Sequence, residues 1–352
     1  MLCLSPGKGG LELYAQRSTQ IIEQLGYHCD TVCNPQSSVF TNKTETINNK
    51  VYTLKTSFHL LPLFSAYQLA RIIDSNEIDI MTIHWSRDFN IAVFAKLLSS
   101  RNVKLIYTRH MAITRYKNDF YHNFLYRNID CFVVITKQLM KEAIQFLPLP
   151  ESKIKLLYHA VNKPESNSSS INCDKFKITS TNTDYLHVAI FSRIEQGKGQ
   201  HLLVEAVKAL KSKNKEIHVT IIGHVMDEQY NTNLKKSIHE YQLDNQFHFY
   251  QFIDQASLYM RCFDVVALTT TAETFGLVLI EAMQSGVAVI GSNAGGVPEI
   301  IDDTVSGLLF ESGNAQALAD KIELLYDDSD FRVSLAQKGK NSVLELFSEQ
   351  QH

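Results

Sequence analysis

Two glutamates stand in one short segment with seven residues between them. Residues 271–283 read T-A-E-T-F-G-L-V-L-I-E-A-M and contain Glu273 and Glu281. A helix is predicted to begin near Phe275 or Gly276, where free backbone amides and the positive end of the helix dipole favour an anion. Carboxylates accept hydrogen bonds from hydroxyls, whereas a diphosphate requires donors and positive charge. The segment therefore suits a sugar nucleotide, and the alternative is that Glu281 is an exposed helix glutamate.

Two further loops combine glycine with basic residues after a predicted strand. Residues 191–199, F-S-R-I-E-Q-G-K-G, place Arg193 and Lys198 where both can neutralise a diphosphate, and a solvated loop is the alternative. Residues 5–10, S-P-G-K-G-G, open the first predicted helix. They match neither GxGxxG nor the P-loop spacing, so they indicate either an anion site or a tight turn without a ligand.

The elements that position these loops follow a repeated order. Short apolar runs alternate with helix-period segments in both halves of the chain, which predicts βαβ units and parallel sheets. The predicted strands are residues 2–4, 28–32, 78–83, 103–108, 131–135, 153–158, 186–191, 217–222, 247–250, 265–268 and 287–290. The predicted helices are residues 11–25, 62–74, 89–98, 119–126, 137–146, 201–211, 230–241, 255–261, 275–284 and 315–326.

The two α/β series are separated by a segment rich in Asn, Ser and Thr, as a linker would be. We expect an N-terminal Rossmann-like domain over residues 1–163, a linker over 164–184 and a C-terminal Rossmann-like domain over 185–352. Ligands of such sheets bind at the carboxyl ends of the strands. The active site is therefore expected in a cleft across which two doubly wound domains face each other.

Composition limits the class of protein. Of the 352 residues, 45% are hydrophobic and 20% are charged, which excludes intrinsic disorder. No apolar run approaches the roughly 18 residues that span a bilayer, so we expect a cytoplasmic protein. The six cysteines show no CxxC spacing, and we expect them to be reduced.

The charge is unevenly distributed. Residues 1–165 carry 19 Lys and Arg against 13 Asp and Glu, and residues 166–352 carry 15 against 24. A basic first half favours an anionic partner, such as a phospholipid surface or a phosphorylated acceptor, over a nucleic acid. An ordinary scatter of charged side chains over the surface would explain this uneven distribution equally well.

Several motifs together resemble one enzyme family. The paired-glutamate block is followed by G-V-A-V-I-G, A-G-G-V-P-E-I-I and S-G-L-L-F, and preceded in order by S-P-G-K-G-G-L-E, I-D-I-M-T-I-H, T-R-H, L-L-Y-H-A-V-N and F-S-R-I-E-Q-G-K-G. This arrangement resembles the retaining glycosyltransferases of family 4, which have the GT-B fold. The resemblance implies that the first domain binds the acceptor and the second binds the nucleotide sugar.

The resemblance also implies residue roles. Glu281 would bind the ribose hydroxyls, and Glu273 would bind hydroxyls of the donor sugar. Arg193 and Lys198 would hold the diphosphate leaving group, and His110 would face the donor sugar. The remaining donor-binding positions are Gly9, Gly10, Phe275, Gly276 and Leu277. His84 and Trp85 are acceptor-side candidates.

The implied reaction is transfer of a hexose, with retention and without metal or cofactor, from a nucleotide diphosphate sugar to a glycan or glycolipid acceptor. A UDP-sugar is the favoured donor, and bacterial surface polysaccharide or lipopolysaccharide synthesis is the expected setting. The acid pair at Asp328 and Asp330 is interpreted as a solvated turn. The alternatives are a sugar-nucleotide epimerase of the same fold and a non-catalytic partner subunit.

Three departures from the family pattern affect these expectations. Ala160 and Met111 stand where relatives often have glycine, which would alter the acceptor side. The chain is also expected to lack part of a terminal helix. Residues 115–127 mix aromatic and basic side chains, which indicates either core packing or contact with the inner face of the cytoplasmic membrane.

Overall fold

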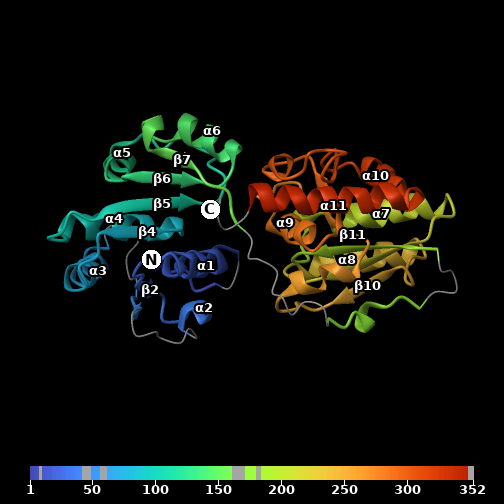
Figure 1. Ribbon diagram of the computed structural model, residues 1–352, viewed down its shortest axis with the longest axis horizontal. Coiled ribbons are helices and arrows are strands. Elements are labelled where there is room, and N and C mark those ends of the chain that lie inside the picture. The colour runs from blue at the N-terminus through green and yellow to red at the C-terminus, as the bar shows by residue number, and fades with distance from the viewer. Residues whose placement is uncertain (8–9, 42–48, 56–61, 161–170, 180–183, 348–352) are drawn as a thin grey trace. The chain divides into compact units, whose positions relative to one another are not determined.

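The computed structural model describes residues 1–7, 10–41, 49–55, 62–160, 171–179 and 184–347. The chain divides into an N-terminal unit, Met1–Tyr158, and a C-terminal unit, His159–His352. Each unit is built on a parallel sheet accompanied by helices (Figure 1). The predicted α/β class with two Rossmann-like domains is confirmed.

The N-terminal unit has a seven-stranded sheet within the described ranges, in the order β3-β2-β1-β4-β5-β6-β7. Every strand pairs in parallel with its neighbours. The order reverses between β1 and β4, and the loops at such a switch point open a crevice at the carboxyl ends of the strands. The strands are β1 (Leu2–Cys3), β2 (Thr31–Cys33), β3 (Val51–Thr53), β4 (Ile80–Ile83), β5 (Lys104–Arg109), β6 (Cys131–Val134) and β7 (Ile154–Leu156).

Helices connect these strands, and two of them begin at side-chain caps. Asp119 accepts a hydrogen bond from His122 N at 3.1 Å, and Thr136 accepts one from Leu139 N at 3.1 Å. The helices are α1 (Gly10–Gln24), α2 (Ser38–Thr41), α3 (Leu63–Ser75), α4 (Phe89–Leu98), α5 (Phe120–Arg127) and α6 (Lys137–Phe146).

The C-terminal unit has a six-stranded parallel sheet in the order β10-β9-β8-β11-β12-β13, again counted over the described residues. Its switch point lies between β8 and β11. The strands are β8 (Leu186–Phe191), β9 (Ile217–Ile222), β10 (Phe247–Tyr250), β11 (Val265–Leu268), β12 (Ala288–Ser292) and β13 (Leu308–Phe310). The helices are α7 (Gln200–Lys211), α8 (Glu228–Glu240), α9 (Leu277–Gln284), α10 (Ala315–Asp327) and α11 (Ser329–Leu346). Helix α7 packs against α8 and α10, whereas α9 packs against α11.

Four strands, β8 to β11, have the predicted bounds. Strands β8, β9 and β11 are buried along nearly their whole length, whereas β10, at the edge of the sheet, is mostly half-buried. The predicted helix over residues 255–261 is a 3₁₀ helix, Ala256–Cys262. Helix α11 was not predicted. The solvated turn predicted at Asp328 connects α10 to α11. The side chain of Asp328 caps α11, because it accepts a hydrogen bond from Phe331 N at 2.8 Å.

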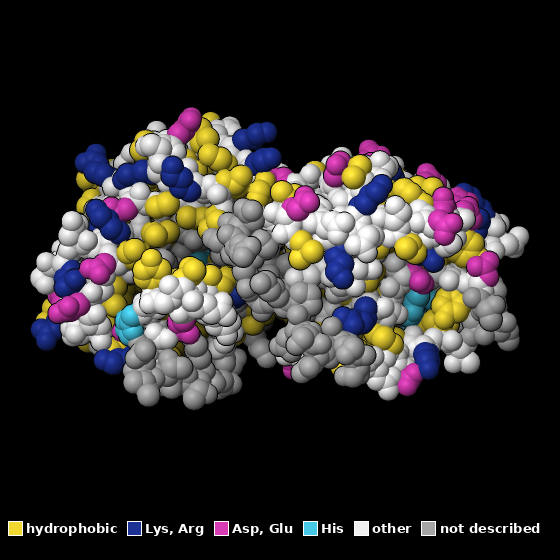
Figure 2. Space-filling model, in the orientation of Figure 1, with side chains coloured by type: hydrophobic (Ala, Val, Ile, Leu, Met, Phe, Trp, Pro, Cys, Tyr) yellow, Lys and Arg dark blue, Asp and Glu magenta, His cyan; other side chains and the backbone are white. Residues whose placement is uncertain are grey.

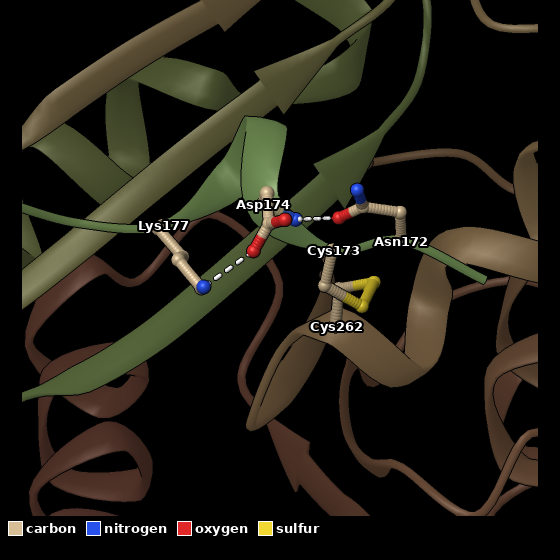
Figure 3. The surroundings of a disulfide bond; sticks show 5 residues. All are labelled: Asn172, Cys173, Asp174, Lys177 and Cys262. Atoms are coloured by element: carbon tan, nitrogen blue, oxygen red, sulfur yellow. Dashed lines mark hydrogen bonds and ion pairs between the residues drawn. A yellow bond between two sulfur atoms is a disulfide. The ribbon is translucent and has the colours of Figure 1, made fainter. Parts of the chain in front are cut away.

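The expectation that all six cysteines are reduced is wrong for two of them. Cys173 and Cys262 form a disulfide across 89 positions of sequence (Figure 3). Cys173 lies within the range predicted as linker, and Cys262 is the last residue of the 3₁₀ helix before β11. Because the two cysteines are so far apart in the sequence, their spacing did not indicate a disulfide. Cys3, Cys29, Cys33 and Cys131 are free thiols.

The described residues 171–179 pack on the rest of the C-terminal unit. Phe176 is 3% exposed, and its ring lies 5.0 to 5.9 Å from the rings of Tyr250, Tyr259 and Phe263. Tyr250 also donates a hydrogen bond to the carbonyl of Lys175 at 2.6 Å. This part of the predicted linker is therefore held by an aromatic cluster as well as by the disulfide, while residues 164–170 and 180–183 lie outside the described ranges.

Candidate functional site

The loop after β8 is fastened to the end of β11. Gly199 has φ +71°, and a Cβ there would lie 2.2 Å from the carbonyl oxygen of Thr269, so only glycine fits. Thr269 Oγ1 donates to Lys198 O at 2.8 Å, and Thr270 Oγ1 donates to Gly197 O at 3.0 Å. Because these bonds hold the backbone at Lys198, its side chain starts from a fixed position at the carboxyl edge of the sheet.

Lys198 and Glu273, which the sequence separates by 75 positions, meet at this edge. Their Nζ and Oε2 atoms lie 3.2 Å apart, and each side chain is 21% exposed. An ion pair that is largely covered interacts more strongly than one in open solvent, since less water screens it. The structure thus brings together two of the four residues that were predicted to be catalytic.

The loop after β12 supports Glu273 from the other side. Gly295 has φ +59°, and a Cβ there would lie 1.8 Å from the carbonyl oxygen of Glu273. Gly296 N donates to that same oxygen at 3.0 Å, and Ser292 Oγ donates to Thr270 O at 2.6 Å. The A-G-G motif therefore holds the backbone at Glu273.

Helix α9 begins directly after the loop that follows β11 and carries Glu273. Gly276 is its N-cap at φ +106°, Leu277 is its first residue, and Glu281 is a half-buried residue in its middle. Phe275 is 3% exposed, and its ring lies 5.0 Å from His159 and 5.9 Å from Phe347. Phe275 lies between Glu273 and the first residue of α9, so its buried ring holds the start of the helix. The first amides of α9 therefore follow Glu273 closely in the sequence.

Arg193 is placed differently from Lys198. Its side chain is 58% exposed and pairs with Glu195, with 2.9 Å between Nη2 and Oε1. Its backbone is held firmly, since Gln200 Nε2 donates to Arg193 O at 2.8 Å and Gln200 is fully buried. The guanidinium is therefore on a rigid loop but in an exposed ion pair, which is weakly held.

In the N-terminal unit, His110 follows β5 and lies beside His84, which follows β4. His84 Nδ1 and His110 Nε2 are 3.1 Å apart, and the ring of Tyr14 from α1 meets both rings at 5.4 and 4.9 Å. Burial, with a smaller contribution from Arg109, lowers the pKa of His110 to about 3. His110 is therefore a neutral imidazole near pH 7.

Two buried carboxylates hold the first loop of the N-terminal unit. Ser5 Oγ donates to Glu12 Oε1, and Leu4 N donates to Asp88 Oδ2 at 3.0 Å. Burial raises the pKa of Asp88 to about 7, although the bond from Leu4 opposes this shift. Gly10 is the first residue of α1, and no described atom lies within 4 Å of a Cβ built there. Gly9 lies outside the described residues.

Sequence reasoning did not identify the residues that hold these loops. Buried polar side chains next to strand ends carry no spacing signal of their own, because their partners come from other strands. The residues missed in this way are Tyr14, Asp88, Gln200, Thr269, Thr270 and Ser292.

Over the described part of the chain, no group of three His, Cys, Asp or Glu side chains is arranged to hold a metal ion. No helix there is long and apolar enough to cross a membrane.

Comparison with known proteins assigns both units to one family. A family model described as Glycosyltransferase Family 4 matches residues 8–163, and one described as Glycosyl transferases group 1 matches residues 173–342. An uncharacterised glycosyltransferase of Methanocaldococcus jannaschii is 22% identical over 346 residues, which are 95% of this chain and 90% of that protein.

Solved structures give the same fold over nearly the whole chain. A glycosyltransferase from Rickettsia africae ESF-5 has a TM-score of 0.87 at 19% identity, covering 99% of this chain and 94% of that one. HepE from Anabaena, solved with UDP-glucose, has a TM-score of 0.81 at 21% identity, covering 99% and 95%. The chain belongs to the GT-B glycosyltransferases of group 1.

Proposed function

We propose that this protein transfers a hexose, with retention of anomeric configuration and without a metal ion, from a UDP-sugar to a glycan or glycolipid acceptor. The proposed setting is bacterial surface polysaccharide or lipopolysaccharide synthesis on the cytoplasmic side of the membrane. The observation that carries the proposal is the Lys198–Glu273 pair beside the start of α9. Here the ammonium of Lys198, the carboxylate of Glu273 that can accept hydrogen bonds from hydroxyl groups, and the first amides of α9 lie close together in the structure.

The donor's charge and hydroxyl groups match these residues. Lys198 and the amides of Phe275, Gly276 and Leu277 would face the diphosphate, while Glu273 would accept hydrogen bonds from the sugar hydroxyls. Glu281, one turn further along α9, would bind the ribose hydroxyls. The complex of HepE with UDP-glucose supports a UDP-sugar as the donor.

Arg193 supplies a second cation once the donor is present. Its exposed pair with Glu195 is weakly held, so the guanidinium can exchange that carboxylate for a phosphate at little cost. A bidentate contact with phosphate would then replace a solvent-screened one. Lys198 and Arg193 would together neutralise the leaving group.

The proposed reaction develops charge on the diphosphate. Breaking the bond between the sugar C1 and the phosphate oxygen leaves the electron pair on UDP and gives the sugar oxocarbenium character. The acceptor oxygen bonds to C1 on the same face, and its proton passes to the departing phosphate oxygen. Preorganised cations and amides stabilise this charge more in the transition state than in the ground state.

The N-terminal unit would supply the surroundings of the sugar. Neutral His110 offers a hydrogen-bonding imidazole without a competing charge, and Gly9 and Gly10 would allow a substrate to approach the first loop. For Gly10 this is supported by the open space around the position.

Contact with an anionic membrane is proposed for the residues around α5. Met111, Tyr116 and Phe120 are 60%, 66% and 90% exposed, while Leu125 and Tyr126 of the same segment are buried. Basic and apolar side chains are interspersed over the part of the N-terminal unit that carries α5 and α6 (Figure 2). An exposed apolar surface among cations suits a membrane that carries a lipid-linked acceptor.

Vesicle co-sedimentation tests this contact. We expect the Lys117→Ala/Arg127→Ala variant to bind vesicles containing anionic phospholipid less tightly than the wild type. The matched Lys235→Ala/Lys236→Ala variant, which removes two cations from α8, should bind as the wild type does. Unchanged binding of the first variant would remove the membrane proposal.

A donor screen tests the activity itself. Purified protein is incubated with UDP-, GDP- and ADP-sugars, with and without extracted glycolipid, and nucleotide release and the anomeric couplings of the product are measured. We expect acceptor-dependent release of UDP, a retained anomer, and loss of release in Glu273→Gln but not in Glu205→Gln, a control on α7.

Other outcomes would contradict the proposal. Conversion of the donor into an isomeric nucleotide sugar without an acceptor would indicate an epimerase. Tight UDP binding with no turnover of any donor would indicate a non-catalytic subunit.

A further inference from the structure

Three aromatic rings meet at the carboxyl edge of the N-terminal sheet. His84 and His110 come from the ends of the adjacent strands β4 and β5, and Tyr14 comes from α1. The two histidine rings have centroids 5.3 Å apart at 37°, and their Nδ1 and Nε2 atoms are within hydrogen-bond distance at 3.1 Å. Tyr14 places its ring edge against both histidines at 70° and 65°.

Two of the three side chains, His110 and Tyr14, carry no charge near pH 7. Burial keeps the pKa of His110 at about 3 and raises the pKa of Tyr14 to about 12. A neutral imidazole has one N–H donor and one acceptor nitrogen. The tautomer of His110 therefore follows from whether Nδ1 of His84 donates or accepts in the bond between them.

We propose that His84 is a positioning residue that acts on the reaction through His110. The bond couples the two rings, so the protonation of His84 Nδ1 decides which nitrogen of His110 carries the proton, and Tyr14 contacts both rings. The proposal rests on the proposed function, in which His110 faces the donor sugar, and extends it by assigning a role to a residue that the sequence placed on the acceptor side.

Burial separates this role from direct acceptor contact. His84 is 5% exposed within the structure, so little of its surface is available to a substrate. A residue of this kind affects a reaction by orienting its neighbour, as groups that hydrogen-bond to reacting side chains do. Its loss should therefore lower kcat while leaving the acceptor KM nearly unchanged.

Two substitutions distinguish the hydrogen bond from ring packing. His84→Phe keeps an aromatic ring against Tyr14 but removes the bond to His110. His84→Asn removes the ring but retains a side-chain amide that can bond at the position of Nδ1. We expect kcat to fall about tenfold to hundredfold in His84→Phe and to remain within about threefold in His84→Asn.

Nitrogen NMR of histidine-labelled protein reads the tautomer directly and does not require turnover. We expect one tautomer of His110 in the wild type and in His84→Asn, and averaged nitrogen shifts in His84→Phe. A single unchanged tautomer in His84→Phe would overturn the proposal, and so would an increase in acceptor KM at constant kcat.

The outcomes separate this proposal from the function it rests on. If the wild type transfers no sugar from any donor, the proposed function fails, whereas the NMR spectra still decide whether His84 sets the tautomer. If transfer occurs and a His84→Phe/His110→Ala double variant loses as much as the two single variants combined, the residues act independently and the positioning role is wrong.

Discussion

The carboxyl edges of the two sheets are built with different chemistry. In the C-terminal unit, glycines with positive φ allow backbones to meet, and these backbones position the largely covered ion pair of Lys198 and Glu273. In the N-terminal unit, buried carboxylates and aromatic rings hold the loop, and His110 is neutral. An edge of the first kind suits a charged ligand, and an edge of the second kind suits hydroxyl groups.

The largest expected loss of stability comes from a substitution that disrupts the backbone packing at the carboxyl edge of the C-terminal sheet. Gly295→Ala places a Cβ against the carbonyl of Glu273 at positive φ, and we expect it to destabilise the unit by about 4–5 kcal/mol. Chemical denaturation measures this loss. Gly313→Ala is the matched control, since φ is +79° there but no described atom lies within 4 Å, and it should cost about 1 kcal/mol. Equal losses in both variants would show that the close approach does not matter.

The next effect tests the buried carboxylate of the N-terminal edge. The pKa of Asp88 is raised in the folded state, so its contribution to stability is fully present below pH 4 and is lost as the pH rises to about 7. Asp88→Asn keeps an acceptor for Leu4 N and cannot ionise. The difference in unfolding free energy between Asp88→Asn and the wild type should therefore shift in favour of the variant, by about 4 kcal/mol between pH 4 and pH 8.

Asp79→Asn provides the comparison for Asp88, because Asp79 is 83% exposed and pairs with Arg101 at the surface. The unfolding free energy of Asp79→Asn should change with pH as that of the wild type does over the same pH range. A constant difference between Asp88→Asn and the wild type at all pH values would contradict the buried, protonated carboxyl.

The disulfide adds a smaller contribution to the C-terminal unit. Cys173→Ser should lower its stability by about 3 kcal/mol, because the bridge restricts the unfolded chain over a long loop. A dithiol reductant should lower the wild type by the same amount and leave Cys173→Ser unchanged. Cys131→Ser, which alters a free thiol, is the control. No response of the wild type to the reductant would contradict the bridge.

The smallest effect on stability is expected at Gly10. Gly10→Ala meets open space at the start of α1 and should change stability by less than about 1 kcal/mol. If a substrate approaches this position, activity should nevertheless fall, and the assay is nucleotide release. Unchanged activity would remove Gly10 from the proposed site.

Much of the fold was predictable from the sequence, and its exceptions have physical causes. Strands β8, β9 and β11 are mostly apolar and almost wholly buried, which made them recognisable. Strands β3 and β13, with three residues each, were not predicted. Helix α11 has only three buried residues in 18, so its apolar face is weak in the sequence.

The site was only partly predictable. The spacing of Glu273 and Glu281 within one segment is local information, and it located α9 correctly. The pairing of Lys198 with Glu273, the contact of Gly295 with Glu273 and the bond between His84 and His110 join segments far apart in the chain. Such contacts depend on strand order, which the sequence pattern leaves open.

The charged character of the C-terminal edge is tested most directly by calorimetric titration with UDP. We predict that Lys198→Met weakens UDP binding about 100-fold, whereas Glu273→Gln binds UDP as tightly as the wild type or more tightly, because a carboxylate that competes for Lys198 is gone. Lys213→Met, which removes a cation paired with Glu323 elsewhere in the same unit, should bind as the wild type does. Wild-type affinity in Lys198→Met would contradict the assignment of this edge to the donor diphosphate.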